Sequence, residues 1–403
     1  MFCRMRYLGF LALALCGLAF ASATAGEPFR FPEGKYGKGE LKYRNGIPVL
    51  IVEGTPQEIG EQVGTLAVKP SHRVTTYPKE ILAALTTPVV AKVLWPIVVR
   101  EGHGLLANFP ADYRVELEAI IKSSGQDREL LEVGNTMFDL KGLLGGLFGC
   151  SALVVQADRS ATGQPIFGRN MDYCSLGYLQ QYTLVTVYRP QGKHAYTAIG
   201  YAGLVGCISG INDAGLALTI LETTGAPASE GPTFDPQAMP YALCYRRLLE
   251  ECTSVKEAES MLRSMKRSTT TNLTLCDKSD SAVFEITPSR LVVRRPEKSI
   301  SICTNHFCSV ELKLPKPRNL FTTLDRFDKL ERVCSVTEKL GVEDVHHFLD
   351  EVNQGELTLQ TMVFEPASLK LHLAVAAGKS PSSAQPLKHL DLSPLFKNER
   401  ARR

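Results

Sequence analysis

From Cys150 onward, clusters of Gly, Asn, Asp and Pro divide the sequence into short β-prone runs, and this punctuation limits the folds open to the chain. The β-prone runs lie at residues 151–157, 166–171, 184–188, 195–200, 206–211, 216–221, 273–276, 282–287, 291–294, 300–304, 360–364 and 370–376. Helical patterns interrupt them at residues 243–251, 254–265, 323–331 and 342–352. Successive groups of strands and helices predict an α+β layered fold with largely antiparallel sheets.

The part of the chain before Cys150 has a different character. Residues 26–43 are rich in Gly, Pro and Lys and predict an extended lead-in. Thr55 and Glu58 form a capping-box pattern, and residues 58–140 carry mostly helical patterns. Because no repeat or linker separates the two parts, we expect one core that is served by the whole exported chain.

Residues 1–25 are predicted to be a signal peptide. A positive start is followed by an apolar run at residues 8–21 and by a small–x–small pattern that ends at Ala25. The protein is therefore expected to be exported (periplasmic, secreted or lumenal), with no stable membrane span after cleavage. The alternatives are a lipoprotein signal at Cys16 and an uncleaved N-terminal anchor.

Charge and cysteine content exclude several classes of protein. The formal net charge is +3, which leaves no electrostatic footprint for nucleic acid. Nine of the eleven cysteines lie after the signal peptide, so in an exported protein at least one is unpaired. No CxxC pair, P-loop or GxSxG elbow is present, and neither a metal nor a cofactor is implied.

The pair Gly149-Cys150 stands where a glycine-rich apolar segment meets the first β-prone run. A chain that cleaves its own backbone lets a Cys sulfur attack the preceding carbonyl, and glycine tolerates the distorted peptide that this attack requires. The product would begin at Cys150, whose α-amine, with a reference pKa of about 7.7–8.0, can serve as the base for its own thiol. A buried or disulfide-bonded cysteine at the start of a strand is the alternative.

Two charged residues follow in the expected hairpin partner of this strand, Arg169 and Asp172. A nearby cation favours the thiolate, and a carboxylate can hold and orient an α-ammonium group. In a regular strand the two side chains would point to opposite faces, so we expect a bend near Asn170.

At this point the sequence resembles a known family, the N-terminal-nucleophile (Ntn) hydrolases of the choloylglycine hydrolase, acid ceramidase and isopenicillin-N acyltransferase group. The resemblance is closest to the acyltransferase-like (penicillin acyltransferase) branch. It rests on ordered motifs: Gly149-Cys150-Ser151, the G-R-N-M-D run at 168–172, G-x-N-x-x-G-L at 210–216, Thr271-Asn272 with Phe284-Glu285, T-N-H-F at 304–307, Thr323-x-x-Arg326, and the glycine-rich run at 54–64.

The resemblance implies a four-layer αββα sandwich with mostly antiparallel sheets, and self-cleavage between Gly149 and Cys150. It implies that residues 26–149 form a small chain and residues 150–403 the catalytic domain, and that these two products stay associated. The implied catalytic residues are Cys150 as nucleophile, Arg169 and Asp172 to hold and tune it, Asn212 and Asn272 as oxyanion donors, and Arg326 to stabilise the site, with Asn305 and His306 as additional candidates.

These residues predict an amidohydrolase or acyltransferase that acts on a small-molecule amide or acyl substrate through a Cys150 thioester. The apolar residues Leu143, Leu144, Leu147 and Phe148 would line an acyl pocket or belong to the core. Two alternatives are an unprocessed thiol enzyme in which His306 is the base for Cys150, and an exported binding protein that keeps the fold without activity.

Overall fold

The computed structural model describes residues 28–140, 149–223 and 225–397. The predicted signal peptide and the four apolar residues predicted to line an acyl pocket before Gly149 lie outside the described residues.

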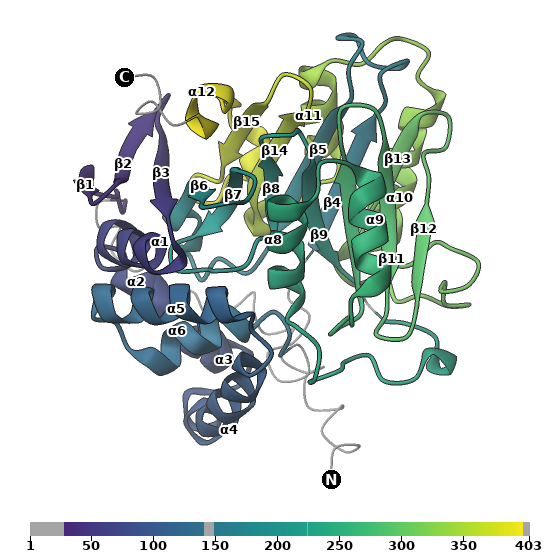
Figure 1. Ribbon diagram of the computed structural model, residues 1–403. Coiled ribbons are helices and arrows are strands. Elements are labelled where there is room, and N and C mark those ends of the chain that lie inside the picture. The colour runs from purple at the N-terminus through teal and green to yellow at the C-terminus, as the bar shows by residue number, and fades with distance from the viewer. Residues whose placement is uncertain (1–27, 141–148, 224, 398–403) are drawn as a thin grey trace.

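Two β-sheets form the centre of the molecule (Figure 1). The first sheet contains, in spatial order, β1 (Gly34–Tyr36), β2 (Gly39–Arg44), β3 (Ile47–Gly54), β6 (Thr183–Pro190), β7 (Tyr196–Tyr201), β8 (Ser209–Asn212), β9 (Ala217–Glu222), β10 (Thr271–Cys276), β11 (Ser281–Ile286) and β12 (Leu291–Arg294). The second contains β13 (Ile300–Cys303), β4 (Gly149–Val155), β5 (Ile166–Asp172), β14 (Thr358–Glu365), β15 (Lys370–Val375) and β16 (Lys388–Asp391). Within these sheets only the β3–β6 pairing is parallel, which confirms the largely antiparallel prediction.

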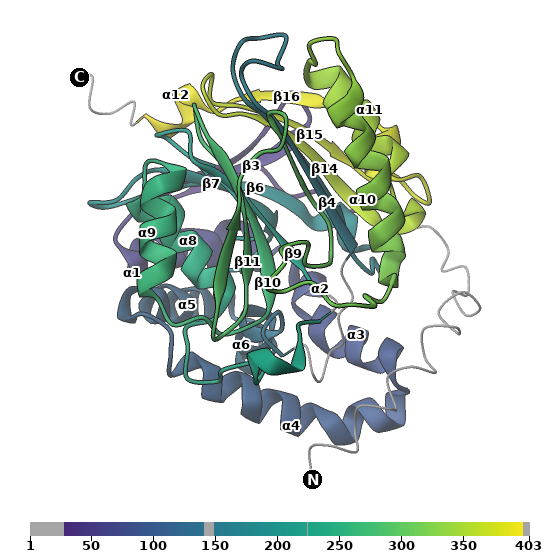
Figure 2. The same cartoon turned by 90° about the vertical axis from the view of Figure 1, so that its right-hand side faces the viewer.

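Helices cover the outer face of each sheet, so that four layers follow one another (Figure 2). On the side of the ten-stranded sheet lie α1 (Pro56–Val63), α2 (His72–Thr75), α3 (Tyr77–Leu85), α4 (Pro88–Leu106), α5 (Ala111–Ser124), α6 (Arg128–Thr136), α8 (Tyr241–Glu251) and α9 (Val255–Ser264). On the side of the six-stranded sheet lie α10 (Thr323–Glu331) and α11 (Val342–Glu351), and α12 (Ser393–Phe396) follows the last strand. The predicted αββα arrangement is confirmed.

Local sequence signals explain some of these boundaries and fail at others. The Thr55 hydroxyl accepts from the Glu58 amide and the Glu58 carboxylate accepts from the Thr55 amide, so the predicted capping box begins α1. Residues 26–43, expected to be an extended lead-in, instead supply β1 and β2, which extend the edge of the first sheet. The glycines and lysines there lowered the apparent strand propensity, and pairing with β3 overrides that propensity.

Three apolar cores fill the spaces between the four layers. The two sheets pack face to face around residues such as Val154, Phe167 and Phe364. A second core lies between the six-stranded sheet and the helices that cover it. It contains Leu153 and Val155, which alternate along β4 with the residues that face the other sheet. Because β4 is buried on both faces, its side chains contribute to two cores, and Cys150 points into the core between the sheets.

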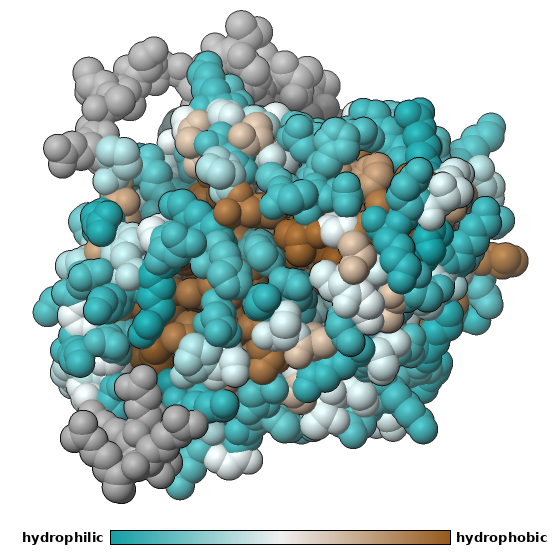
Figure 3. Space-filling model, turned by 90° about the horizontal axis from the view of Figure 1, so that it is seen from above, coloured by the Kyte–Doolittle hydropathy of each residue, from teal (hydrophilic) through white to brown (hydrophobic). Residues whose placement is uncertain are grey.

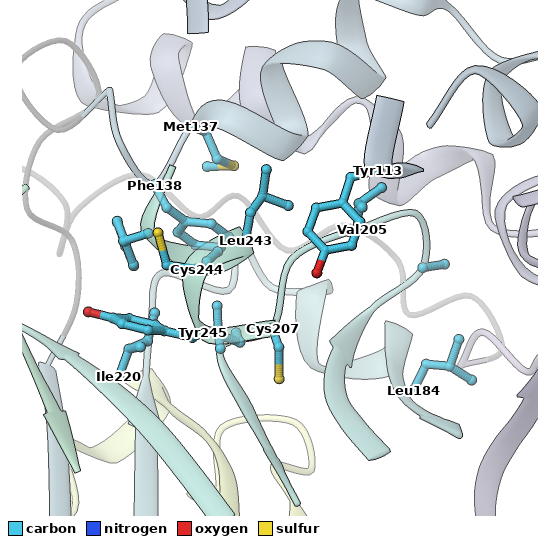
Figure 4. Packing of buried hydrophobic residues seen from close by; sticks show 14 of the residues in the cluster. Tyr113, Met137, Phe138, Leu184, Val205, Cys207, Ile220, Leu243, Cys244 and Tyr245 are labelled. Carbon is cyan, nitrogen blue, oxygen red and sulfur yellow. The ribbon is translucent and has the colours of Figure 1, made fainter. Parts of the chain in front are cut away.

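The largest core joins the part of the chain before Gly149 to the part after it (Figure 4). Phe138 lies close to Leu243 and Cys244 of α8, and Tyr113 of α5 lies close to Val205, all within one core. Burial of large apolar side chains contributes about 1.5–3 kcal/mol each, so this shared core contributes strongly to holding the two parts together.

The surface seen from above carries mainly hydrophilic side chains, with apolar ones visible between them in its central part (Figure 3). Exposed large apolar residues gather on α4, at Val89, Val90, Val93 and Ile97. In the described ranges, no helix combines the length and the apolar character that crossing a membrane requires.

Candidate active site

Cys150 is the second residue of β4 and is almost completely buried. Three different side chains contact its three polar groups. Its backbone N–H donates to the Oδ1 atom of Asn305 over 2.7 Å, its carbonyl accepts from Nη1 of Arg326, and its Sγ atom lies 3.3 Å from Nη2 of Arg169. The structure therefore fixes the nucleophile candidate at its amide, its carbonyl and its sulfur.

Arg169 and Asp172 reach this site from opposite faces of β5, which is a regular strand through Asn170 rather than the bent one expected. Cys150 pairs with Met171, so Arg169 lies on the same face as the sulfur, two residues along. Asp172 pairs with Gly149, and the Thr358 hydroxyl donates to its Oδ1 over 2.6 Å. The two charges serve the cysteine without a bend because one lies beside the sulfur and the other beside Gly149.

Gly149 owes its place to close packing. Its φ angle is not positive, so a left-handed backbone conformation is not the reason for a glycine here. A Cβ at this position would lie 3.1 Å from Oδ2 of Asp172 and 3.3 Å from Cβ of Phe321. The small residue lets the Asp172 carboxylate approach the peptide that joins Gly149 to Cys150.

Burial dominates the electrostatics of the site. Desolvation raises the pKa of the Cys150 thiol, and the Arg169 cation opposes that rise. Burial also raises the pKa of Asp172 to about 6, against the opposing effects of Arg326, Thr358 and Arg169. Oδ2 of Asp172 has no hydrogen-bond partner among the described residues. The site thus holds a carboxylate with unused acceptor capacity beside the Gly149–Cys150 peptide.

Arg326 links the nucleophile strand to α10. Its Nη1 also donates to the Ser151 hydroxyl over 2.8 Å, and its Nη2 donates to Oδ1 of Asn305 over 2.7 Å. Its Nε donates to the Phe321 carbonyl over 2.9 Å, which fixes the guanidinium plane at the start of the helix. The structure therefore brings Arg326 and Asn305 to Cys150, together with Arg169 and Asp172.

The two predicted oxyanion donors are placed differently. Nδ2 of Asn212 donates to the carbonyls of Leu249 and Cys252, and its Oδ1 accepts from the amides of Ala214 and Leu216. The Asn212 side chain thus links the turn after β8 to the end of α8 by hydrogen bonds. Its amide hydrogens are already used on carbonyls, on the helix side of the sheet.

Asn272 faces the inter-sheet side but also has both amide hydrogens engaged. Its Nδ2 donates to the carbonyls of Thr304 and His306, over 3.1 and 3.0 Å. It therefore contacts the segment that carries Asn305 rather than Cys150 itself. Of the three predicted asparagines, Asn305 is the one in contact with the nucleophile.

The contacts of His306 do not support a role as the base for Cys150. Its Nδ1 lies 3.2 Å from the Thr304 hydroxyl and 3.0 Å from the Thr323 hydroxyl, and its ring packs edge-to-face on Phe327. Burial, together with Arg294 and Arg326, lowers its pKa to about 4. The ring is neutral at ordinary pH and bonded to hydroxyls, as expected of a buried structural histidine.

Two further residues of the site carried no signal in the sequence. Thr358 of β14 holds Asp172, and the Ser209 hydroxyl of β8 accepts from Arg169. Thr358 is brought to the site by the pairing of β14 with β5, and Ser209 by the packing of the ten-stranded sheet against the six-stranded one, so the three-dimensional structure reveals both. All nine cysteines in the described residues are free thiols, which leaves Cys150 available for chemistry.

A mainly apolar cavity of about 70 Å³ lies on the helix side of the site. Its lining includes Met137 and Phe138 and the aromatic rings of Tyr77, Tyr173 and Tyr201. Tyr173 directly follows Asp172 in the chain, but Cys150 and Asp172 themselves are not among the residues that line the cavity.

Comparison with known protein families gives one match that covers much of the chain. The sequence model of the acyl-coenzyme A:6-aminopenicillanic acid acyl-transferase family matches residues 159–380, more than half of the chain. A comparison with curated proteins found no match.

Among the solved structures similar to this chain are proteins from three organisms. An N-acylethanolamine-hydrolyzing acid amidase ortholog from Caenorhabditis elegans is 20% identical, with a TM-score of 0.43 over 54% of this chain and 93% of that one. A variant of the conjugated bile acid hydrolase from Clostridium perfringens is 15% identical, with a TM-score of 0.44 over 62% and 95%. Penicillin V acylase from Agrobacterium tumefaciens is 15% identical, with a TM-score of 0.41 over 60% and 92%.

Proposed function

Because the chain belongs to the acyl-coenzyme A:6-aminopenicillanic acid acyl-transferase family, we propose that it is a self-processing cysteine enzyme that cleaves a linear amide, or transfers its acyl group, through a thioester at Cys150. One observation carries the proposal: the amide, the carbonyl and the sulfur of Cys150 are each held by a different polar side chain. The buried Cys276 and Cys303 are different, because each turns its thiol toward the carbonyl of the next residue.

In the processing step, Sγ of Cys150 attacks the carbonyl carbon of Gly149, and the bond from that carbon to the Cys150 nitrogen breaks. The nitrogen takes up the proton that the thiol loses, and water then hydrolyses the thioester. The products are a carboxylate at Gly149 and a free α-amine at Cys150. Arg169 favours the thiolate in this step, because its cation lies beside the sulfur.

The new α-amine would find its partners in place. Oδ1 of Asn305 already accepts from this nitrogen, and Oδ2 of Asp172 faces the position that Gly149 vacates. In turnover the α-amine takes the thiol proton while Sγ attacks the substrate carbonyl, and the leaving amine receives a proton as the thioester forms. Water or a second amine then accepts the acyl group.

The apolar cavity that Tyr173 helps to line supports an apolar acyl group as the part of the substrate that is held. Its lining is mainly apolar and aromatic, which favours burial of hydrocarbon over charged groups. We further infer that residues 1–25 direct export and are removed, so that the working enzyme consists of residues 26–149 and 150–403.

N-terminal sequencing and a substrate panel together test the proposal. The purified protein should give one N-terminus near Gly26 and a second that starts at Cys150. The Cys150→Ala variant should leave the bond between residues 149 and 150 uncleaved and give the first N-terminus alone. N-acyl amides of increasing acyl length should be hydrolysed by the wild type and not by Cys150→Ala, and mass spectrometry should find the acyl group on Cys150. An intact wild-type chain with full activity would contradict self-processing, and a thiol that resists alkylation in an inactive protein would favour a binding function.

A further inference from the structure

Asn272 and Glu285 are directly opposite each other on the neighbouring strands β10 and β11. Side chains that are opposite each other on antiparallel strands lie on the same face of the sheet. Both residues are completely buried, and both contact the segment from Thr304 to Ser309, which we call the 304–309 loop. This loop follows β13 and carries Asn305.

The two side chains hold the loop by opposite hydrogen-bonding chemistry. Asn272 donates both amide hydrogens to carbonyls at the start of the loop, those of Thr304 and His306. The Glu285 carboxylate accepts the amide of Cys308 over 2.7 Å, the amide of Ser309 over 3.0 Å and the Ser309 hydroxyl. The pair therefore satisfies donors and acceptors at both ends of the loop from one point on the ten-stranded sheet.

A cation is paired with the fully buried Glu285 carboxylate. Nε of Arg294, on β12, lies 2.8 Å from Oε1 of Glu285 as an ion pair, although the N–H is not aligned for a hydrogen bond. Nη2 of Arg294 donates to the Ile302 carbonyl of β13, directly before the loop. Buried charges are expensive unless they are paired and hydrogen-bonded, and this carboxylate is both.

The loop in turn presents one side chain to the nucleophile. Between its two held ends, the Asn305 amide donates to the Thr323 hydroxyl over 2.8 Å and the Asn305 Nδ2 donates to the Glu222 carbonyl over 2.7 Å. Oδ1 of Asn305 then accepts from the backbone nitrogen of Cys150. A displacement of the loop would move this oxygen away from the nitrogen that becomes the α-amine.

We propose that Asn272 and Glu285 are positioning residues, which set the Asn305 carboxamide against Cys150 by clamping the 304–309 loop from the opposite sheet. The inference rests on the proposed function for its catalytic consequence. It assigns to Asn272 a contribution through the loop in place of a direct contact with an oxyanion, and it gives Glu285 a role that its place in the sequence motif does not reveal.

Two measurements test the clamp, and the first needs no turnover. In the Cys150→Ala chain, which keeps the backbone N–H at position 150, we expect Glu285→Gln to speed hydrogen exchange of that N–H at least about tenfold, and Asn305→Ala, which removes its acceptor, to do the same. The matched control is Ser281→Ala, which removes buried hydrogen bonds to Gln156 and Ser301 between the same two sheets but does not touch the loop. Exchange that is unchanged in Glu285→Gln would overturn the proposal whether or not the protein is an enzyme.

The second measurement is a double-mutant cycle on the best substrate of the N-acyl amide panel. Glu285→Gln and Asn272→Ala should each lower kcat about ten- to a hundredfold with KM within about twofold, because a small misplacement near the reacting atoms is costly. In the Asn305→Ala background, Glu285→Gln should cost less than about threefold more. Full additivity of the two changes, or a loss equal to that of Ser281→Ala, would contradict action through Asn305. A wild type without turnover or a second N-terminus would instead reject the proposed function, while the exchange result still decides on the clamp.

Discussion

Arg169 approaches Cys150 from the neighbouring strand, with its Nη2 atom 3.3 Å from the cysteine Sγ and its Nη1 donating to the Ile208 carbonyl over 3.0 Å. The second contact anchors the guanidinium to the ten-stranded sheet, so the cation stands between the two sheets beside the sulfur. Burial raises the pKa of the Cys150 thiol, and this cation is the main group that opposes the rise.

Removal of the cation should therefore slow the chemistry of the thiol. In Arg169→Gln the pKa of Cys150 should rise further, and alkylation of Cys150 at pH 7 should slow about tenfold or more, since one pKa unit corresponds to about 1.4 kcal/mol. Iodoacetamide labelling from pH 6 to 10, resolved by peptide mass spectrometry, measures the effect. The exposed Arg295→Gln is the control, and an unshifted profile for Arg169→Gln would remove the cation from the mechanism.

The close approach at Gly149 gives a prediction about processing. In Gly149→Ala the new Cβ would press on Oδ2 of Asp172 and on Phe321, so the Asp172 carboxylate must give way slightly beside the scissile peptide, and self-cleavage should slow about tenfold or more. Gly104→Ala in α4 meets no atom within 4 Å and should leave cleavage unchanged. Appearance of the 150–403 chain on denaturing gels over time measures both, and cleavage at the wild-type rate in Gly149→Ala would refute the steric argument.

Replacement of Asp172 by a neutral residue is expected to raise stability and to abolish activity. Its folded pKa of about 6 lies above the ordinary value of 3.8, so the native state binds more protons between these values and the free energy of unfolding falls as pH rises through them. In the uncleaved Cys150→Ala chain, Asp172→Asn should raise stability by about 2–3 kcal/mol at pH 7.5 and by almost nothing at pH 3.5. In the chain that retains Cys150 the same change should abolish turnover.

Chemical denaturation at the two pH values measures this difference. The exposed Asp391→Asn serves as the control and should show no such dependence on pH. Asp172→Asn that destabilises the chain at pH 7.5 would mean that the native carboxylate is better compensated than its contacts indicate.

The parts of the site that lie close together in the chain were predictable from the sequence. Which face of a strand carries each side chain was not. Cys150, Arg169 and Asp172 lie on consecutive antiparallel strands joined by the connection 156–165, so their proximity follows from the hairpin. The strands that carry Asn212 and Asn272 are buried along their whole length, so alternation of polar and apolar residues cannot tell which face meets the other sheet. The outcome is that Asn212 faces α8 and Asn272 faces the 304–309 loop.

Asn212 is therefore expected to act on stability. Asn212→Ala removes four hydrogen bonds of a buried side chain and should lower the free energy of unfolding by about 2–4 kcal/mol. Once folded, the variant should keep kcat within about twofold, as measured on protein that is normalised for its folded fraction. A fall in kcat of about 10²–10³ with unchanged KM would restore the oxyanion role that the family resemblance implies.

Two adjacent arginines on α8 allow the association of the two product chains to be tested. Arg246 is buried, donates to both carboxylate oxygens of Glu116 over 2.8 and 2.6 Å, and donates to Glu250 over 2.7 Å. Glu116 lies on α5, before the predicted cleavage point, so this ion pair joins residues 26–149 to residues 150–403. Arg247 makes an equivalent pair with Glu251 at the surface, within one helix.

Arg246→Ala should cost about 3–5 kcal/mol, because it leaves the buried Glu116 carboxylate without its cation while Glu250 keeps its ion pair with Lys193, whereas a surface pair such as that of Arg247 is worth at most about 1 kcal/mol. The cleaved protein should therefore elute as one species in size-exclusion chromatography for the wild type and for Arg247→Ala. In dilute urea, the Arg246→Ala protein should release the small chain at concentrations that leave the control intact. Equal urea midpoints for the two variants would place the association in the apolar core of Tyr113, Phe138 and Leu243 alone, with the buried charges contributing nothing to it.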